Sequence, residues 1–298
     1  MPSLMRSLAA TAALALSLSL PAYAGSYNDG HAYHIFPTPA ERAKTGRIPH
    51  VGATGEMEYF AGSVFSKVNV ISVIWGPNVN PQFVSGMPGF FTAIVNSTFV
   101  DQLSIYDTDI EGVNGKQGTD QTIARGTYQT QIQITPHNKH TTLTDGQVRK
   151  ELEYQIKKGV LPATNPNNLY MIYFPANITI LLGSSRSCEA FGAYHEAVDS
   201  KPSASNIFYG VMPDCGYSFD EETIVSSHEF AEATTDNIPT PGSHPKYPQA
   251  WNTSDGYEIG DLCEGTQGTL TAGNTTYYVQ EVYLNNIAGC GTGNFHSP

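Results

Sequence analysis

The sequence predicts a single α/β domain with a mixed β-sheet, a long helix that begins near residue 220, a C-terminal β-hairpin and two disulfides. Apolar runs rich in β-branched residues, such as residues 68–75, are typical of buried strands. Segments with helical periodicity and capping residues alternate with these runs, which is the pattern of α/β folds. No linker, repeat or low-complexity block divides the chain, and its length suits one domain of about 250 residues.

Residues 1–24 are predicted to be a signal peptide. Arg6 supplies the positive charge, Leu8–Leu20 the apolar core and Ala22–Ala24 the small-x-small cleavage site. This apolar core is too short to span a bilayer. We therefore expect a protein that is secreted or periplasmic, begins near Gly25 and is not attached to a membrane after cleavage.

Residues 25–60 show no sustained periodicity and are predicted to form an irregular N-terminal arm, in which His31 and His34 are solvated. Residues 61–298 are predicted to form the folded domain. Strand patterns in this domain occur at 68–75, 103–106, 128–134, 169–174, 178–182 and 206–212. Helical patterns occur at 81–96, at 144–159 and from Asp220 onward, and the hairpin arms are predicted at 257–262 and 276–284.

The helix that begins near Asp220 carries the main functional motif. The segment Ser218-Phe219-Asp220-Glu221 is a capping-box pattern that starts it. His228 and Glu232, at i and i+4, lie on one face of this helix, and Glu229 is adjacent in sequence. The spacing matches the His-Glu-x-x-His helix of zinc proteases, with glutamate in place of the second histidine. Carboxylate oxygen is an acceptable zinc ligand, so the motif predicts a metal site.

A mononuclear hydrolytic site needs three protein ligands and a carboxylate base. His228 and Glu232 are two candidate ligands, and Glu229 is the candidate base. Glu258, in an acidic segment 30 residues after His228, is the candidate third ligand, with Asp261 in reserve.

Two further residues are candidate members of the site. Asp236 lies one turn beyond Glu232, although a role at the helix C-terminus is favoured for it. His195 follows Cys188 in the sequence and is either a ligand, a donor to a ligand or a structural histidine.

The competing interpretation of the motif is an ordinary solvated helix face, because glutamate is common on helices. The capping box, the acidic segment downstream and the 14% charged composition favour a metal site over that interpretation. Zinc is the expected ion, and calcium is the alternative for a purely structural ion. A set of one imidazole and two carboxylates would, however, suit a harder ion than zinc somewhat better. A serine hydrolase is not supported, since the chain has no Gly-x-Ser-x-Gly motif.

Composition and cysteine content define the expected partners and compartment. The formal net charge of −12 argues against binding to nucleic acid or to anionic membranes, which attract basic surfaces.

Four cysteines in an exported chain indicate two disulfides, for which three pairings exist. We favour Cys188–Cys215 with Cys263–Cys290, because each closes a local loop beside the functional helix.

The order of motifs from the strand at 68–75 to Cys290 resembles the phosphate-induced, exordium-like protein family, and above all its exported bacterial relatives. The resemblance rests on Tyr170–Pro175, Cys188–His195, the helix ending Thr235-Asp236 and Glu258–Cys263. The bacterial relatives carry a His-Glu-x-x-Glu helix. The plant members are associated with cell-wall growth and lack the His-Glu pair, so the resemblance implies that the fold also exists without catalysis.

The expected function is that of an exported metal-dependent hydrolase, with a zinc metallopeptidase favoured. Water activated by the metal would attack a peptide or cell-wall-associated substrate, with Glu229 as the base. The alternative is a non-catalytic extracellular protein that binds a wall polysaccharide or a partner, with or without a structural ion. The sequence makes no prediction of oligomeric state.

Overall fold

The computed structural model describes residues 25–26, 32–33, 35–45, 55–199, 201, 203–239, 244–291 and 293–298. The predicted signal peptide lies outside the described residues, as do His31 and His34.

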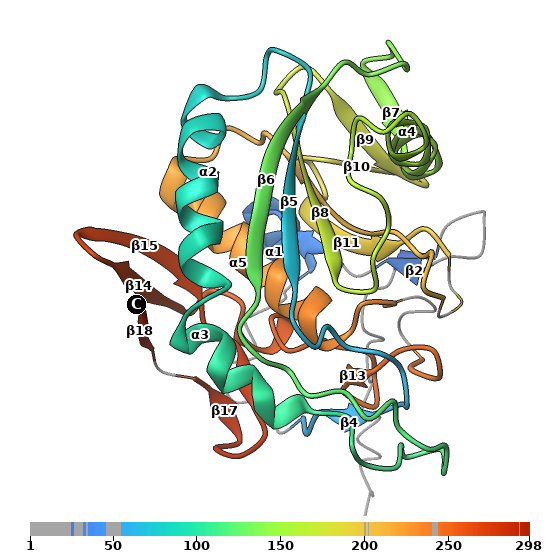
Figure 1. Cartoon of the computed structure of the whole chain (residues 1–298), viewed down its shortest axis with the longest axis vertical. Coiled ribbons are helices and arrows are strands. Elements are labelled where there is room, and N and C mark those ends of the chain that lie inside the picture. The colour runs from blue at the N-terminus through green and yellow to red at the C-terminus, as the bar shows by residue number, and fades with distance from the viewer. Residues whose placement is uncertain are drawn as a thin grey trace, which may run out of the picture.

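A six-stranded mixed sheet forms the centre of the molecule, with strand order β3-β11-β12-β8-β5-β6 (Figure 1). Strands β12, β8, β5 and β6 run parallel to one another, whereas β11 is antiparallel to β12 and β3 is antiparallel to β11. The strand bounds are β3 Phe36–Pro37, β5 Asn69–Trp75, β6 Thr127–Ile134, β8 Asn168–Phe174, β11 Phe191–Ala197 and β12 Phe208–Pro213.

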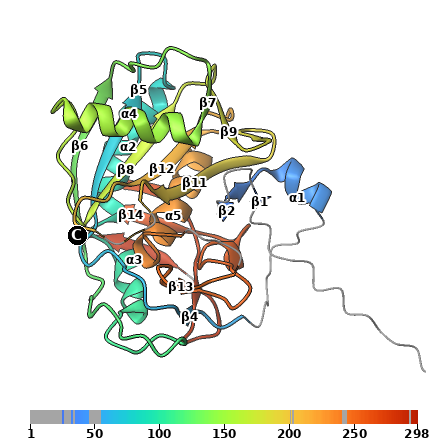
Figure 2. The same cartoon turned by 90° about the vertical axis from the view of Figure 1, so that its right-hand side faces the viewer.

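Both faces of this sheet are covered, which explains why its inner strands are apolar runs without polar alternation. In β5, Val70 and Ile74 belong to the core beneath α2 (Pro81–Ile94) and α5 (Phe219–Thr235). Ile71 and Val73 of the same strand face the other core, which contains residues of α4 (Asp145–Lys157). The helices thus form layers on opposite sides of the sheet (Figures 1 and 2). On the α4 side lies a small second sheet of β7 (Thr142–Thr144), β9 (Thr179–Leu182) and β10 (Ser185–Arg186).

Most predicted elements are confirmed to within two residues, including the strands at 68–75, 128–134, 169–174 and 206–212 and the three helices. Local capping sets the helix starts. The Asn80 side chain accepts a hydrogen bond from the Gln82 amide at the start of α2, and capping boxes begin α4 at Thr144 and α5 at Ser218.

The predicted strand at 103–106 is wrong. Helix α3 (Thr98–Asp101) begins after Ser97, whose hydroxyl accepts a hydrogen bond from the Phe99 amide, and it continues as the 3₁₀ helix η1 (Gln102–Tyr106). Leu103 and Tyr106 are both buried in η1. A spacing of three residues between core side chains fits one face of a 3₁₀ helix rather than one face of a strand.

The first predicted arm of the C-terminal hairpin, at 257–262, is also wrong, whereas the second, at 276–284, coincides with β15 (Thr275–Gln280) and β16 (Tyr283–Leu284). The hairpin joins β14 (Gln267–Ala272) to β15 (Thr275–Gln280) through the two-residue loop Gly273-Asn274, a common hairpin turn. Gly273 has a positive φ of 56°. Residues 257–262 form no strand and lead into the 3₁₀ turn η2 (Asp261–Cys263). Strand β18 (Asn294–Ser297) pairs in parallel with β14.

The N-terminal segment is more regular than the sequence predicts. It contains the short strands β1 (Gly25–Ser26) and β2 (Ala32–Tyr33), then β3 and helix α1 (Pro39–Thr45). Strand β3 pairs with β11 and so joins the central sheet, which corrects the prediction of an irregular arm. Strand β4 (Glu58–Tyr59) pairs with β13 (Trp251–Asn252), and β16 (Tyr283–Leu284) pairs with β17 (Gly289–Cys290).

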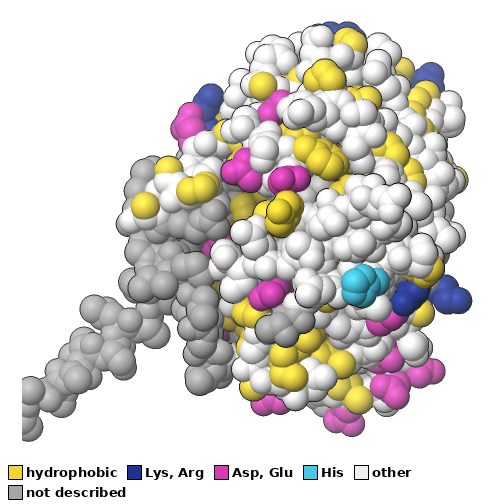
Figure 3. Space-filling view, turned by 90° about the vertical axis from the view of Figure 1, so that its left-hand side faces the viewer, with side chains coloured by type: hydrophobic (Ala, Val, Ile, Leu, Met, Phe, Trp, Pro, Cys, Tyr) yellow, Lys and Arg dark blue, Asp and Glu magenta, His cyan; other side chains and the backbone are white. Residues whose placement is uncertain are grey.

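The structure confirms the predicted disulfides Cys188–Cys215 and Cys263–Cys290, which are compatible with an extracellular or other oxidising compartment. On the face shown in Figure 3, Asp and Glu side chains are scattered and Lys and Arg lie near the margins. Among the described residues, no single helix is long and apolar enough to cross a membrane, although α2 and the segment Thr98–Tyr106, bent by 51°, meet that test together.

Candidate metal centre

Helix α5 carries His228, Glu229 and Glu232 into the interior of the molecule. The capping box at Ser218 starts the helix, and nearly all residues from Glu222 to Thr235 are buried against β11, β12 and β15. His228 is 0% exposed, and Glu229 and Glu232 are each 1% exposed. These residues therefore do not form a solvated helix face, and the competing interpretation of the motif is wrong.

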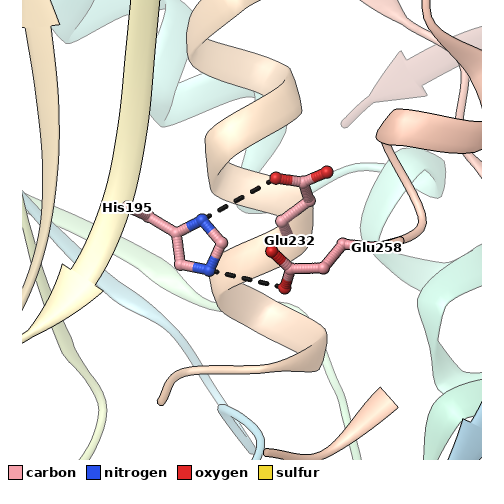
Figure 4. Close-up of side chains that lie close together, drawn as sticks. All are labelled: His195, Glu232 and Glu258. Carbon is pink, nitrogen blue, oxygen red and sulfur yellow. Dashed lines mark ion pairs between the residues drawn. The ribbon is translucent and has the colours of Figure 1, made fainter. Parts of the chain in front are cut away.

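His195 reaches the same place from β11. The strand alternates, so that Ala193 and Ala197 belong to the core on the α5 side and Tyr194 to the core on the opposite side. His195 points towards α5, between Glu232 and Glu258 (Figure 4). Its Nδ1 lies 3.1 Å from Glu229 Oε2 and 3.7 Å from Glu232 Oε2.

The other ring nitrogen of His195 faces different groups. His195 Nε2 lies 3.2 Å from the backbone oxygen of Asp236 and 3.6 Å from Glu258 Oε1. A histidine that binds a metal through one nitrogen commonly donates its other N–H to a carbonyl or a carboxylate. The surroundings of His195 fit that arrangement, with Nδ1 facing the carboxylates of α5.

Glu258 comes from the loop before η2, which packs directly against α5. The Asp261 amide donates a hydrogen bond to Glu232 Oε1 (3.1 Å), and the Glu258 amide donates one to Asp261 Oδ2 (3.0 Å). Gln280 Nε2 donates to the Gly260 carbonyl at 2.7 Å. Asp261 thus links the loop to Glu232 through its amide, while its carboxylate accepts a hydrogen bond from the backbone of Glu258 within the loop.

Gly260 permits the close approach of this loop to the helix. A Cβ atom added at Gly260 would lie 2.6 Å from His228 Nδ1 and 2.7 Å from Glu232 Oε1. Real Cβ atoms do not approach other atoms so closely, because packed interiors leave no such space. Any other residue at this position would displace one of the two side chains or the loop.

Asp236, at the C-terminus of α5, is engaged in structural hydrogen bonds. Its Oδ2 accepts a hydrogen bond of 2.6 Å from Asn252 Nδ2, and its Oδ1 accepts one of 3.3 Å from the Ile238 amide. These bonds agree with the role at the helix terminus that the sequence favours for this residue.

Two overlapping sets of side chains could hold a metal ion, and Glu232 belongs to both. His195, Glu232 and Glu258 form one set and His228, Glu229 and Glu232 the other, with the ligand atoms of each set within 4.8 Å of one another. The sequence-predicted ligands His228, Glu232 and Glu258 are thus all present, but Glu258 is grouped with His195 rather than with His228. Imidazole and carboxylate donors suit zinc and harder divalent ions alike.

The pKa values of the cluster reflect its burial and its concentrated charge. Burial lowers the pKa of His228, but the negative charge of Glu232 and the hydrogen bond to it, together with Glu229 and Asp261, raise that pKa to about 10. Burial is the main cause that raises the pKa of Glu232 and takes that of Glu258 well above its usual range. The cluster thus favours bound positive charge, either protons or a cation.

Three contributors to the site have no detectable signal in the local sequence pattern. Phe36 packs edge-on against the His228 ring with centroids 5.0 Å apart, although 192 positions separate them. Gly260 contributes the absence of a side chain where a Cβ atom would not fit, and Gln280 contributes a hydrogen bond to the Gly260 carbonyl. Each role depends on contacts between segments far apart in the chain, which periodicity and spacing do not reveal.

No family model, curated protein or solved structure matches the chain. The resemblance to the exordium-like family stays a prediction, and the function has to be argued from the site.

Proposed function

We propose that the buried cluster on α5 binds a divalent metal ion and that the protein is an exported metal-dependent hydrolase, with a zinc peptidase as the preferred assignment. The observation that carries the proposal is the state of His228. Among the described residues, Nδ1 of this fully buried histidine has no hydrogen-bond partner, while its Nε2 forms an ion pair with Glu232 Oε2 at 3.0 Å. A buried polar group without a hydrogen bond is costly, and a metal ion would satisfy this one.

Glu232 would be the central ligand, because it belongs to both sets of donors. His228 would bind beside it from one turn earlier on α5. Glu258, from the loop before η2, would be the third ligand and would leave one position open for water. His195, on β11, would position the carboxylates, because its ring nitrogens lie 3.7 Å from Glu232 Oε2 and 3.6 Å from Glu258 Oε1. The donor set fits zinc, and calcium would be expected to recruit more oxygen ligands than imidazoles.

The protein groups around the ion would have distinct tasks. When bound, the ion would supply Lewis-acid activation of water and of a substrate carbonyl. Glu229 would accept the proton of the attacking water, and its hydrogen bond with His195 Nδ1, 3.1 Å long, would orient its carboxylate. His195 would be held in turn by the Asp236 carbonyl.

Elemental analysis of the purified mature protein, together with His228→Ala, tests the metal site. We expect about one zinc ion per chain in the wild type, since the shared ligand Glu232 defines one centre, and loss of the ion in His228→Ala. His296→Ala is the matched control, because this histidine is exposed on β18. A folded wild type without metal contradicts the proposal, and calcium retained by His228→Ala would assign the protein a structural ion instead.

Activity is tested with the variant Glu229→Gln on a mixture of unstructured peptides analysed by mass spectrometry. The expected result is retention of the ion with hydrolysis reduced at least 100-fold, since general-base catalysis contributes about 10²–10⁴-fold. Hydrolysis by Glu229→Gln at the wild-type rate would exclude the role of Glu229 as the base.

A further inference from the structure

Next to the metal centre lies a cavity of about 180 Å³ that the proposed chemistry does not use. Phe36, Pro39, Ile224 and Val225 provide much of its apolar lining, and Gln280 lies among its polar residues. An apolar cavity of about 150 Å³ is already large enough to hold a benzene molecule. The volume therefore suits one apolar side chain of a ligand.

The cavity is connected to the metal centre through three contacts. Val225 and Ile224 precede His228 by three and four residues, which places them ~4.5–6 Å along the α5 axis from it and on the same side of the helix. Phe36 lines the cavity and packs against the His228 ring. The Gln280 side chain donates to the carbonyl of Gly260, where an added Cβ atom would collide with His228 and Glu232.

We propose that this cavity binds an apolar side chain of a peptide substrate beside the scissile bond. That the bound peptide is a substrate rests on the proposed hydrolase function. The binding of an amide of an apolar amino acid is a property of the cavity itself. It predicts a preference for leucine-like or phenylalanine-like residues over glycine or charged residues. A polysaccharide, which lacks large apolar side groups, would not use this cavity.

The test compares N-acetyl-leucine amide with N-acetyl-glycine amide by calorimetry on the full mature protein. The two probes carry the same amide groups and differ only in the isobutyl group. We expect the leucine probe to bind the wild type at least tenfold more tightly. The free energy gained by burying a leucine side chain exceeds the free energy that corresponds to a tenfold change in affinity.

Variants at Ile224 locate the binding site. Ile224 is only partly buried, so Ile224→Phe should fill the cavity without disrupting the core and should abolish the preference for leucine. Ile224→Ala, which enlarges the cavity, should weaken leucine binding and improve binding of N-acetyl-tryptophan amide. Ile110→Phe, at a position that is 44% exposed, is the control and should behave as the wild type.

The outcomes separate this proposal from the proposed function. Equal binding of the leucine and glycine amides, or a leucine preference that survives Ile224→Phe and Ile224→Ala, overturns the cavity assignment even if an ion and peptide hydrolysis are found. A leucine preference that Ile224→Phe removes supports the cavity assignment even if no metal binds, in which case the proposed hydrolase is overturned.

Discussion

Glu222 shows what burial does to a single carboxyl group of α5 outside the metal centre. It is 1% exposed, and neither of its carboxyl oxygens has a hydrogen-bond partner among the described residues. Burial, assisted by the negative charge of Asp214, raises its pKa from 4.5 to about 8. Glu222 is therefore protonated in the folded protein at neutral pH. The acids of the metal centre differ from it, because they lie beside His195 and His228.

This pKa shift predicts a pH dependence of stability. Between pH 4.5 and about 8 the folded state holds a proton on Glu222 that the unfolded state has lost, so the free energy of unfolding should fall as pH rises through this window. Glu222→Gln keeps the shape of the side chain without its charge and should remove that part of the decline. Urea unfolding at pH 5 and pH 8.5 should show the variant gaining about 4 kcal/mol relative to the wild type at the higher pH.

The control is Glu153→Gln, at an exposed position of α4, which should leave the pH dependence unchanged. Parallel pH profiles for the wild type and Glu222→Gln would contradict the assignment of a raised pKa to Glu222.

At the scale of elements, the site depends on the packing of the loop before η2 against α5. The loop bears Glu258, and at Gly260 it leaves no room for a Cβ atom beside His228 and Glu232. Gly260 has φ −75°, a conformation open to any residue, so only the lack of space requires glycine there. The contact is thus a steric condition for bringing Glu258 to Glu232.

We predict that Gly260→Ala weakens metal affinity at least tenfold and lowers the free energy of unfolding by about 1–3 kcal/mol, the usual cost of overpacking a core. Competition with a chelator and urea unfolding measure the two effects. Gly146→Ala in α4 is the matched control, because its added Cβ would meet no atom closer than 3.9 Å. That control should keep its metal affinity and be slightly stabilised. Unchanged affinity in a folded Gly260→Ala protein would show that the loop does not position a ligand.

The elements themselves were largely predictable, for a local reason. The capping boxes at Thr144 and Ser218 and the apolar run at 69–75 act through contacts within a few residues. The errors arose where local pattern was ambiguous. Leu103 and Tyr106 lie on a short apolar stretch that suits a strand or a 3₁₀ helix. Residues 257–262 have the sequence pattern of a strand but form a loop that contacts α5.

At the scale of the whole molecule, the two disulfides provide a matched pair of constraints. Each joins cysteines 27 residues apart, so loss of either should cost a similar ~3.5 kcal/mol in the loop-entropy model. Their positions differ, because Cys263 directly follows the loop that carries Glu258, whereas Cys188–Cys215 joins segments that precede β11 and α5.

We therefore predict that replacing Cys263 and Cys290 by serine weakens metal affinity more than replacing Cys188 and Cys215, while both double variants lose similar stability. Thermal unfolding and chelator competition give the two measurements. Equal metal affinity in the two double variants, both folded, would contradict a role of the Cys263–Cys290 disulfide in holding the Glu258 loop.

The sequence by itself determined the helix that carries His228, Glu229 and Glu232, the main strands, and the choice of disulfides that the structure confirms. The helix and the strands depend on interactions between residues close in the chain, which leave a readable pattern. The disulfide pairing was chosen among three because each bridge closes a local loop of 27 residues. Only the tertiary structure decided that the motif is buried, that His195 lies between Glu232 and Glu258, and that a cavity adjoins His228. Those features depend on strand order and on packing between segments far apart in the sequence, and no local periodicity encodes which side chains then meet.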